Sequence, residues 1–311
     1  MKKLVFVLVS MIILAVICIY VFIPGTINVS KIAISPSTEN GTERMLADQS
    51  SWIKWWPSKT SDGNNRYYLN DYSFSTNRRV GDDIEIIITN KQDSVASVVN
   101  VVPKGTDSAI FTWKCKLETN LNPFNRLMLY FKASDIKKSM DEITPSLLTF
   151  CSNQENVYGF KITMDVMTDT LLITYKAGVN EYPDTKYIYG YIDQLKTYAA
   201  SQGAIQTGTP LIHLEQMDSS LYGLMVAIPI DREIKSHDDF IFKHMPHDNL
   251  LVSPEIKGGV NEVAKAYRSM VNYMTDYQRI SPGISFMSFI TDRANEPDSF
   301  KWRTKILYPV F

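Results

Sequence analysis

The hydrophobic pattern of the chain begins with a continuous apolar run over residues 4–23, in which Ser10 is the only small polar residue. Two lysines precede the run, and Pro24-Gly25 ends it. A helix that rises about 1.5 Å per residue extends roughly 30 Å over a run of this length, which is the thickness of the hydrocarbon core of a bilayer. The pattern therefore predicts a transmembrane anchor within residues 1–25.

Three other interpretations of this run fit the residues less well. A secretory signal peptide usually has an apolar part of about 7–15 residues followed by a small-residue cleavage site. A lipoprotein would carry a small residue before Cys18, where Ile17 stands, and a buried core helix is rarely apolar all round.

Because the lysines precede the run and the next basic residue is Lys31, the positive-inside rule places the N-terminus in the cytoplasm. The remaining residues are then extracytoplasmic, and periplasmic if the cell is Gram-negative.

Residues 27–153 combine strand-like alternation with two helical stretches. Strand-like runs are expected at residues 29–34, 67–69, 83–89, 95–102 and 108–117. A helical stretch after Ser35-Pro36 ends in three tryptophans before Pro57, and a long helix is expected over residues 131–151 with a kink at Pro145. This order predicts an antiparallel meander closed by one long helix. The inward faces of the last strand and of this helix are Ala109, Phe111, Trp113, Cys115 and Leu117, and Ile136, Met140, Ile143, Leu147 and Cys151.

The strand that leads into Ser35-Pro36, the segment SSWIKWWP and the long helix after NPFNR together resemble the SRPBCC superfamily, the START or polyketide-cyclase-like helix-grip domains. The resemblance implies that residues 27–153 form a curved sheet that grips the long helix around an apolar cavity for a hydrophobic ligand. The chain departs from the family where Glu39, Asn40 and Gly41 replace the usual apolar entry. Its large aromatic residues are therefore either cavity walls or plain core. They are Trp52, Trp55, Trp56, Phe111 and Trp113.

Residues 156–311 contain an internal repeat of the order strand, helix, strand, strand. The first copy is expected at residues 159–175, 187–202, 210–217 and 223–230, and the second at 240–252, 260–277, 284–291 and 300–310. Each final strand ends in a proline between hydrophobic residues, where the missing N–H is tolerated. Two such copies are expected to pack about a pseudo-two-fold axis, with a ligand cleft where their sheets meet.

The ordered segments TGTPLIHLE, VAIPI, VSPEIKGG, SFITD, EPD and KWRTKILYPV resemble a GyrI-like domain, the effector-binding domain also found in AraC-type and MerR-type regulators. The resemblance implies a pocket lined by aromatic residues, in which an acidic residue of the penultimate strand often pairs with cationic ligands. Met287 stands at that acidic position, so apolar contact replaces the preference for cations. The other ligand-binding candidates are Tyr191 and Phe289, together with Trp302 and Tyr308 of the last strand. Tyr191 is alternatively a core residue, because it belongs to the apolar stripe of its helix.

Composition and charge exclude several classes of function. The chain has 311 residues, and 32 Lys+Arg against 33 Asp+Glu leave a formal net charge of −1, so no global basic field recruits nucleic acid. No helix-turn-helix precedes the second region, which excludes a one-component DNA-binding regulator. No phosphate-binding loop or nucleophile motif appears either, so no cofactor is expected.

The cysteines and histidines do not form a recognisable metal site. The three cysteines lack the paired close spacing of zinc or iron–sulfur ligands, and Cys115 and Cys151 are either two buried thiols or a disulfide. His244 and His247, followed by Asp248, bracket a proline-containing dipeptide that breaks the regular spacing of two ligands to one ion. We therefore expect no metal.

These patterns predict an α+β protein with one transmembrane helix, a helix-grip domain over residues 27–153 and a duplicated GyrI-like domain over residues 156–311. We expect a membrane-anchored sensor or sequestering protein for a small apolar or aromatic molecule, rather than an enzyme. Two alternatives remain open: a hydrolase that uses carboxylates such as Glu215 or Glu255 in the GyrI-like pocket, and a structural or signalling ectodomain. The polar loop that contains Arg293 is expected to be solvated.

Overall fold

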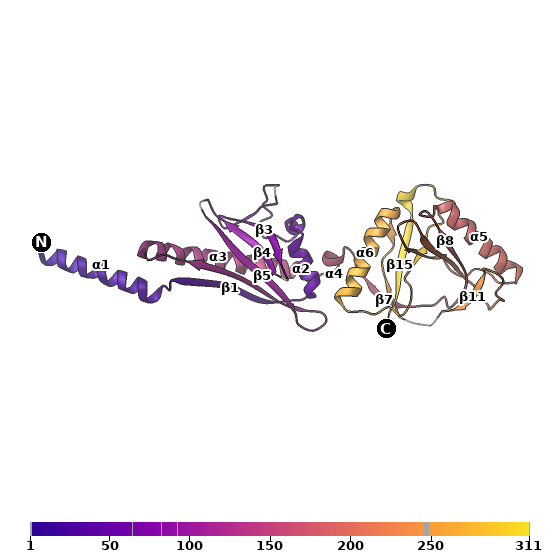
Figure 1. Cartoon of the computed structure of the whole chain (residues 1–311), viewed down its shortest axis with the longest axis horizontal. Coiled ribbons are helices and arrows are strands. Elements are labelled where there is room, and N and C mark those ends of the chain that lie inside the picture. The colour runs from indigo at the N-terminus through magenta and orange to yellow at the C-terminus, as the bar shows by residue number, and fades with distance from the viewer. Residues whose placement is uncertain (1, 64, 82, 92, 246–248, 311) are drawn as a thin grey trace. The chain divides into compact units, whose positions relative to one another are not determined.

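The computed structural model describes residues 2–63, 65–81, 83–91, 93–245 and 249–310. The chain divides into two compact units, Met1–Val157 and Tyr158–Phe311, and each unit combines helices with an antiparallel sheet (Figure 1). The protein is therefore of the α+β class, with two curled antiparallel sheets.

The first helix, α1 (Lys2–Phe22), is long and apolar enough to cross a bilayer over Lys3–Phe22, where the mean hydropathy is 3.2 and no part of the helix is buried. Its C-terminal end is fixed to the rest of the first unit by Arg126. The guanidinium of Arg126 lies 4.5 Å from the ring centroid of Tyr20 and donates a hydrogen bond to the carbonyl oxygen of Ile23 at 3.1 Å. Membrane anchors and N-terminal signal sequences both have this length and composition.

The first unit contains one sheet and four further helices. Its strands are β1 (Thr26–Ser35), β2 (Tyr67–Leu69), β3 (Tyr72–Val80), β4 (Asp83–Thr89), β5 (Ser94–Pro103) and β6 (Ala109–Glu118). Its helices are α2 (Glu39–Ala47), the 3-10 helix η1 (Gln49–Lys54), α3 (Pro123–Cys151) and α4 (Gln154–Tyr158). The strands pair in the order β1-β6-β5-β4-β3-β2, and α3 packs along β1.

The core of the first unit follows the predicted faces, because every residue expected to point inward from β6 and from α3 is buried. The helix α3 nevertheless begins at Pro123, earlier than expected, because Asn122 accepts a hydrogen bond from the N–H of Phe124 at 2.9 Å and caps it. The helix continues through Pro145. The strand β3 was not expected, since only its first residues alternate between buried and partly exposed positions.

The tryptophans of the first unit form a packed core. Trp52 and Trp56 stack with ring centroids 5.3 Å apart and planes 4° from parallel. Their indole N–H groups donate to the carbonyl oxygens of Leu46 and Tyr68, each at 2.9 Å, whereas the buried Nε1 of Trp55 has no partner among the described residues. Trp113 likewise donates to the hydroxyl of Ser97 at 2.9 Å. These contacts favour the interpretation of the aromatic residues as core.

The second unit contains nine strands and three helices among its described residues. The strands are β7 (Thr163–Val166), β8 (Leu171–Val179), β9 (Leu211–Gln216), β10 (Tyr222–Pro229), β11 (Ile241–His244), β12 (Asn249–Val252), β13 (Ile256–Lys257), β14 (Phe286–Phe289) and β15 (Arg303–Val310). The helices are α5 (Thr185–Ser201), α6 (Val260–Asp276) and the 3-10 helix η2 (Ser299–Lys301).

The sheet of the second unit shows the expected repeat, with one difference at the start of each copy. Its order is β11-β8-β10-β9-β14-β15-β12-β7, so the triplets β8-β10-β9 and β12-β15-β14 meet where β9 pairs with β14. The segment expected to form the first strand of each copy is divided into two strands, β7 and β8 in the first copy and β11 and β12 in the second. The earlier strand of each copy pairs with the triplet of the other copy, because β7 pairs with β12 and β11 pairs with β8. The two copies therefore exchange edge strands.

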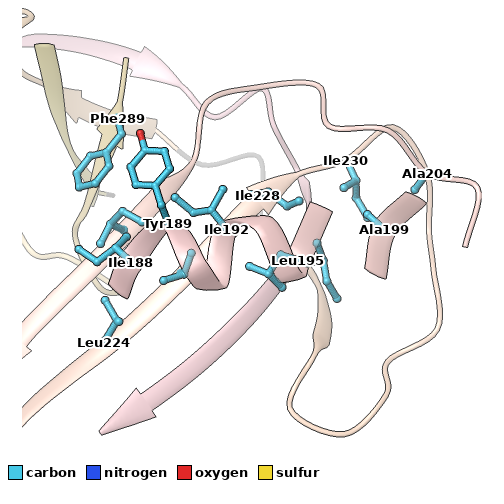
Figure 2. Close-up of a cluster of buried hydrophobic side chains, with 13 residues drawn as sticks. Ile188, Tyr189, Ile192, Leu195, Ala199, Ala204, Leu224, Ile228, Ile230 and Phe289 are labelled. Atoms are coloured by element: carbon cyan, nitrogen blue, oxygen red, sulfur yellow. The ribbon is translucent and has the colours of Figure 1, made fainter. Parts of the chain in front are cut away.

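Side chains alternate between the two faces of this sheet, as expected for strands. One face, called the helix face below, carries Ile173, Ile212, Leu224 and Val226, which form one buried cluster with the apolar residues of α5. Figure 2 labels Leu224 of this face with Ile188, Ile192 and Leu195 of α5. The other face carries a separate apolar cluster. It consists of Met167, Leu172, Leu211, Ala227, Leu250, Val252 and Phe286. Asp184 is the N-cap of α5, and its carboxylate accepts a hydrogen bond from the N–H of Tyr187 at 2.7 Å.

Cys115 and Cys151 are buried free thiols, so the expected alternative of a disulfide is not present. Burial raises the pKa of Cys115 to about 11 and that of Cys151 to about 12, because desolvation disfavours the thiolate. Both thiols are therefore protonated at neutral pH.

Candidate functional site

A cleft of about 260 Å³ lies on the helix face of the second unit, where the two copies of the repeat meet. Ile212 of β9 and Met287 of β14 are paired residues of the junction, and both line the cleft. The first turns of α5 and α6 border it through Thr185, Ile188, Val260 and Val263. The remaining lining residues are Tyr182, Pro183, Asp184, Leu214, Phe289, Arg293 and Trp302. The cleft therefore has a mostly apolar wall with few polar groups, which is typical of small-molecule sites.

Arg293 is the cation of this cleft, and two aromatic rings hold it. The centre of its guanidinium lies 3.5 Å from the ring centroid of Phe289 and 4.5 Å from that of Trp302. Its Nη2 donates to the hydroxyl of Thr304 at 2.6 Å, whereas its Nε is buried and has no hydrogen-bond partner among the described residues. Burial lowers the pKa of Arg293 to about 10, so the group remains charged at neutral pH.

Two hydrogen bonds position Arg293 and Trp302 in the segment between β14 and β15. The backbone N–H of Arg293 donates to the hydroxyl of Tyr189 on α5 at 2.7 Å. At the other end of the loop the indole N–H of Trp302 donates to the carbonyl oxygen of Glu296 at 2.8 Å. These two hydrogen bonds tie both ends of the loop, so Arg293 and Trp302 keep fixed positions beside Phe289. The expectation that this loop is solvated is therefore wrong at Arg293.

Three of the five predicted ligand-binding residues lie together in this cleft: Met287, Phe289 and Trp302. Tyr191 lies outside it. Its ring stacks on Tyr175 with centroids 4.1 Å apart, and it borders a separate open depression on the surface. Their roles in binding a ligand remain predictions.

Tyr308, the fifth predicted residue, also lies outside the cleft. It shares strand parity with Trp302, but it is buried and packs against Tyr267 of α6, with ring centroids 5.5 Å apart. Desolvation raises the pKa of its phenol, and Tyr267 is a hydrogen-bond partner that raises it further. The helix α6 therefore covers the end of β15 where a ligand was expected.

Sequence reasoning missed Arg293, Tyr182 and Asp184 as residues of the site. Tyr182 lies close enough to Arg293 for the cation to lower its phenol pKa, although burial raises that pKa by more. The sequence does contain one signal for Arg293, because the arginine follows the predicted penultimate strand closely. Only the tertiary structure shows that the guanidinium of Arg293 lies over the rings of Phe289 and Trp302.

A second cavity of about 310 Å³ lies on the opposite face of the same sheet. Met167, Met225 and Met245 contribute to its apolar lining, together with Phe286. Its polar groups include His213, whose Nδ1 lies 2.7 Å from the carbonyl oxygen of Ser285. This cavity was not predicted from the sequence, and its lining combines strand residues such as Leu172 and Leu211 with loop residues such as Pro282 and Gly283.

The carboxylates proposed for a hydrolase do not lie in the cleft. Glu215 is exposed, with an oxygen 3.6 Å from Nε2 of His213, and Glu255 pairs with Arg303 at 3.3 Å. The carboxylate that does line the cleft, Asp184, caps α5. The positions of Glu215 and Glu255 therefore give no support to a hydrolase that uses them in this cleft.

The described residues contain no group of three or more His, Cys, Asp or Glu side chains that could hold a metal ion. His244 lies on the surface with its Nε2 3.1 Å from a carboxylate oxygen of Glu233. His247 and Asp248, which follow His244 closely in the sequence, lie outside the described residues.

Comparison with known proteins found similarity only among solved structures, since no family model and no curated protein matches the chain. The C-terminal domain of EcmrR is 16% identical, with a TM-score of 0.42, and the match covers 49% of this chain and 98% of that domain. SAV2435 bound to tetraphenylphosphonium is 16% identical over 49% of this chain and 94% of that protein, with a TM-score of 0.33. A START superfamily protein from Mycobacterium smegmatis is 12% identical over 38% of this chain and 97% of that protein, with a TM-score of 0.25. All three matches have TM-scores below 0.5 and identities below 25%.

Proposed function

We propose that the second unit binds a small, largely apolar or aromatic molecule in the cleft on its helix face, and that α1 holds the protein at a membrane. The observation that supports binding most directly is the cleft itself, with Phe289, Trp302 and Met287 on one wall. Aromatic rings supply contact area, and methionine adapts its shape to different ligands. A volume of about 260 Å³ suits a molecule of about two fused rings rather than a drug-sized ligand, whose pockets are roughly 300–1,000 Å³.

We favour the helix-face cleft as the ligand site over the cavity on the opposite face because of the polar group in the cleft. Ligand sites typically combine an apolar wall with a few placed polar side chains, and displaced pKa values gather at such sites. In the cleft, Arg293 has a lowered pKa and a buried Nε without a partner among the described residues. In the opposite cavity His213 already has its contact with Ser285. The GyrI-like resemblance of the sequence also implies an aromatic-lined pocket for the second unit.

The membrane part of the proposal is supported by α1 and by the start of α3. Leu121, Phe124 and Met128 are 80%, 76% and 70% exposed, and this end of α3 contacts α1. Exposed apolar side chains beside an apolar helix are suited to the interfacial region of a bilayer. We propose that the N-terminus is cytoplasmic and that both units are extracytoplasmic, on the charge distribution around the run.

A pair of cleft-filling variants tests the binding site. Leu214 lines the helix-face cleft and Met225 lines the opposite cavity, and both lie on adjacent strands of one sheet. We expect Leu214→Trp to abolish binding of neutral naphthalene-2-sulfonamide, whereas Met225→Trp leaves its affinity within twofold. The measurement is isothermal titration calorimetry of the full chain in nanodiscs, with empty nanodiscs as the blank and thermal melts to establish folding. Loss of binding in Met225→Trp alone would place the site on the opposite face.

A further inference from the structure

We infer that the helix-face cleft selects ligands with a negatively charged group attached to an aromatic or apolar body, and that Arg293 binds this group. The inference rests on the proposed binding function of the cleft and adds the class of ligand. Aromatic carboxylates, sulfonates and phosphate esters share this chemistry. Met287 occupies the position where the sequence resemblance implies an acidic residue, so the main fixed charge that faces the apolar wall has the opposite sign.

Arg293 has hydrogen-bonding capacity that the protein does not use. A guanidinium carries five N–H donors in a planar fork. One of its nitrogens, Nη2, donates to Thr304, and the buried Nε has no partner within the described part of the chain. A buried donor without a partner costs free energy, and an oxygen of an anionic ligand would remove that cost.

Arg293 also has no ion-pair partner among the described residues. Among the residues that line the cleft, Asp184 is the other charged group, and one of its oxygens is already engaged in capping α5. Asp292, the neighbour of Arg293 in the chain, accepts hydrogen bonds within its own loop. The described residues show no ion pair between Arg293 and a carboxylate. A desolvated cation without a direct ion pair is unfavourable, so an anion is the complementary ligand.

The two rings keep the guanidinium in position for this role. The central carbon of the guanidinium lies over the rings of Phe289 and Trp302, at 3.5 and 4.5 Å from their centroids, and cation–π attraction favours this position. The backbone hydrogen bond to Tyr189 fixes the residue at its base. The site is therefore organised before a ligand arrives, which reduces the entropy lost on binding.

Both long helices of the second unit direct their N-terminal ends at the cleft. Thr185 and Val260, the first residues of α5 and α6, line it. Helix N-termini carry a partial positive charge. Gly259 precedes α6 and offers no side chain to cap its first N–H groups, so they add to the attraction for an anion.

The test compares two probes of matched shape, the anion naphthalene-2-sulfonate and the neutral naphthalene-2-sulfonamide, on the full chain in nanodiscs by calorimetry. The wild type is expected to bind the sulfonate at least tenfold more tightly than the sulfonamide. Arg293→Gln should weaken the binding of the sulfonate at least tenfold and change the affinity for the sulfonamide by no more than about threefold. Arg303→Gln is the matched control, because Arg303 is exposed, pairs with Glu255 and does not line the cleft. It should change neither affinity.

A second variant keeps the test independent of the folding of Arg293→Gln. Asp184→Asn removes the negative charge of the cleft while asparagine still caps α5, so it should strengthen sulfonate binding and leave the sulfonamide unchanged. Equal affinity of the wild type for the two probes, or loss of sulfonate binding in Arg303→Gln and not in Arg293→Gln, would overturn the anion inference. If the sulfonamide still binds in the cleft, the proposed function survives that result. If Leu214→Trp changes neither probe, the proposed function itself fails.

Discussion

Replacing Trp302 by alanine removes one aromatic wall of the cleft, and the structure gives the size of the expected effect. A tryptophan buries about 200 Å² when fully covered. If a ligand covers about a third of that area, the lost contact at about 25 cal/mol/Å² is roughly 1.7 kcal/mol, which corresponds to a roughly 15-fold weaker affinity. The ring also holds Arg293, so the loss for an anionic probe should exceed the loss for a neutral one.

The same substitution should cost less stability than loss of a core tryptophan. Trp302 gives up a hydrogen bond to Glu296 and its contact with Arg293, together about 2 kcal/mol. Trp52, which is fully buried, should lose about 3–5 kcal/mol as alanine. The exposed Phe300 serves as a control of the same loop, and Phe300→Ala should change neither stability nor affinity.

The assay is calorimetric titration of each variant with both naphthalene probes, together with urea unfolding followed by tryptophan fluorescence and circular dichroism. If Trp302→Ala leaves both affinities within twofold while the second unit stays folded, the cleft is not the ligand site. If the variant unfolds without a change of affinity in the folded fraction, Trp302 is a core residue and the assignment fails.

Three further predictions concern charge, thiols and the N-terminus. Met287→Glu should weaken the binding of naphthalene-2-sulfonate at least tenfold and strengthen the binding of 2-naphthyltrimethylammonium, because a carboxylate would then share the cleft with Arg293. Unchanged affinities for both probes in calorimetry would argue against this geometry. Cys115 and Cys151 should react with a thiol reagent only after denaturation, and rapid labelling of both thiols in the native protein would contradict their burial. Because their pKa values are raised in the folded state, the unfolded state releases thiol protons first, and the first unit should lose stability as the pH rises above about 9. N-terminal sequencing of the mature protein should find α1 still attached, and a chain that begins near Gly25 would show that α1 is a signal sequence.

The periodic parts of the fold could be predicted from the sequence. The inward faces of β6 and α3 are buried as expected, because period-two and helical patterns record which side meets the core. The start of α3 could not be found in this way, since its exposed first turns face no core and carry only the cap at Asn122 as a signal. The exchange of β7 and β11 between the two copies depends on which strands meet in space, and hydrophobic period does not contain that information.

The candidate site likewise contains some residues that could be predicted from the sequence and others that could not. The family resemblance named Met287, Phe289 and Trp302, and the three side chains line one cleft on the helix face. Parity also placed Tyr308 on that face, but parity does not reveal that α6 covers this end of the strand. Arg293 lies in a loop of charged residues, and such loops are usually solvated. Its contacts with the rings of Phe289 and Trp302 and its hydrogen bond to Tyr189 depend on the tertiary structure.

The central claim, that the helix-face cleft holds an anionic aromatic molecule, is tested most directly by photolabelling. The full chain in nanodiscs would be irradiated with 6-azidonaphthalene-2-sulfonate, digested and mapped by mass spectrometry. The account predicts labels on peptides that contain Met287, Arg293 or Trp302, with competition by naphthalene-2-sulfonate and strong reduction in Arg293→Gln. Labels confined to Met225 or Met167 of the opposite cavity, or to the first unit, would contradict it.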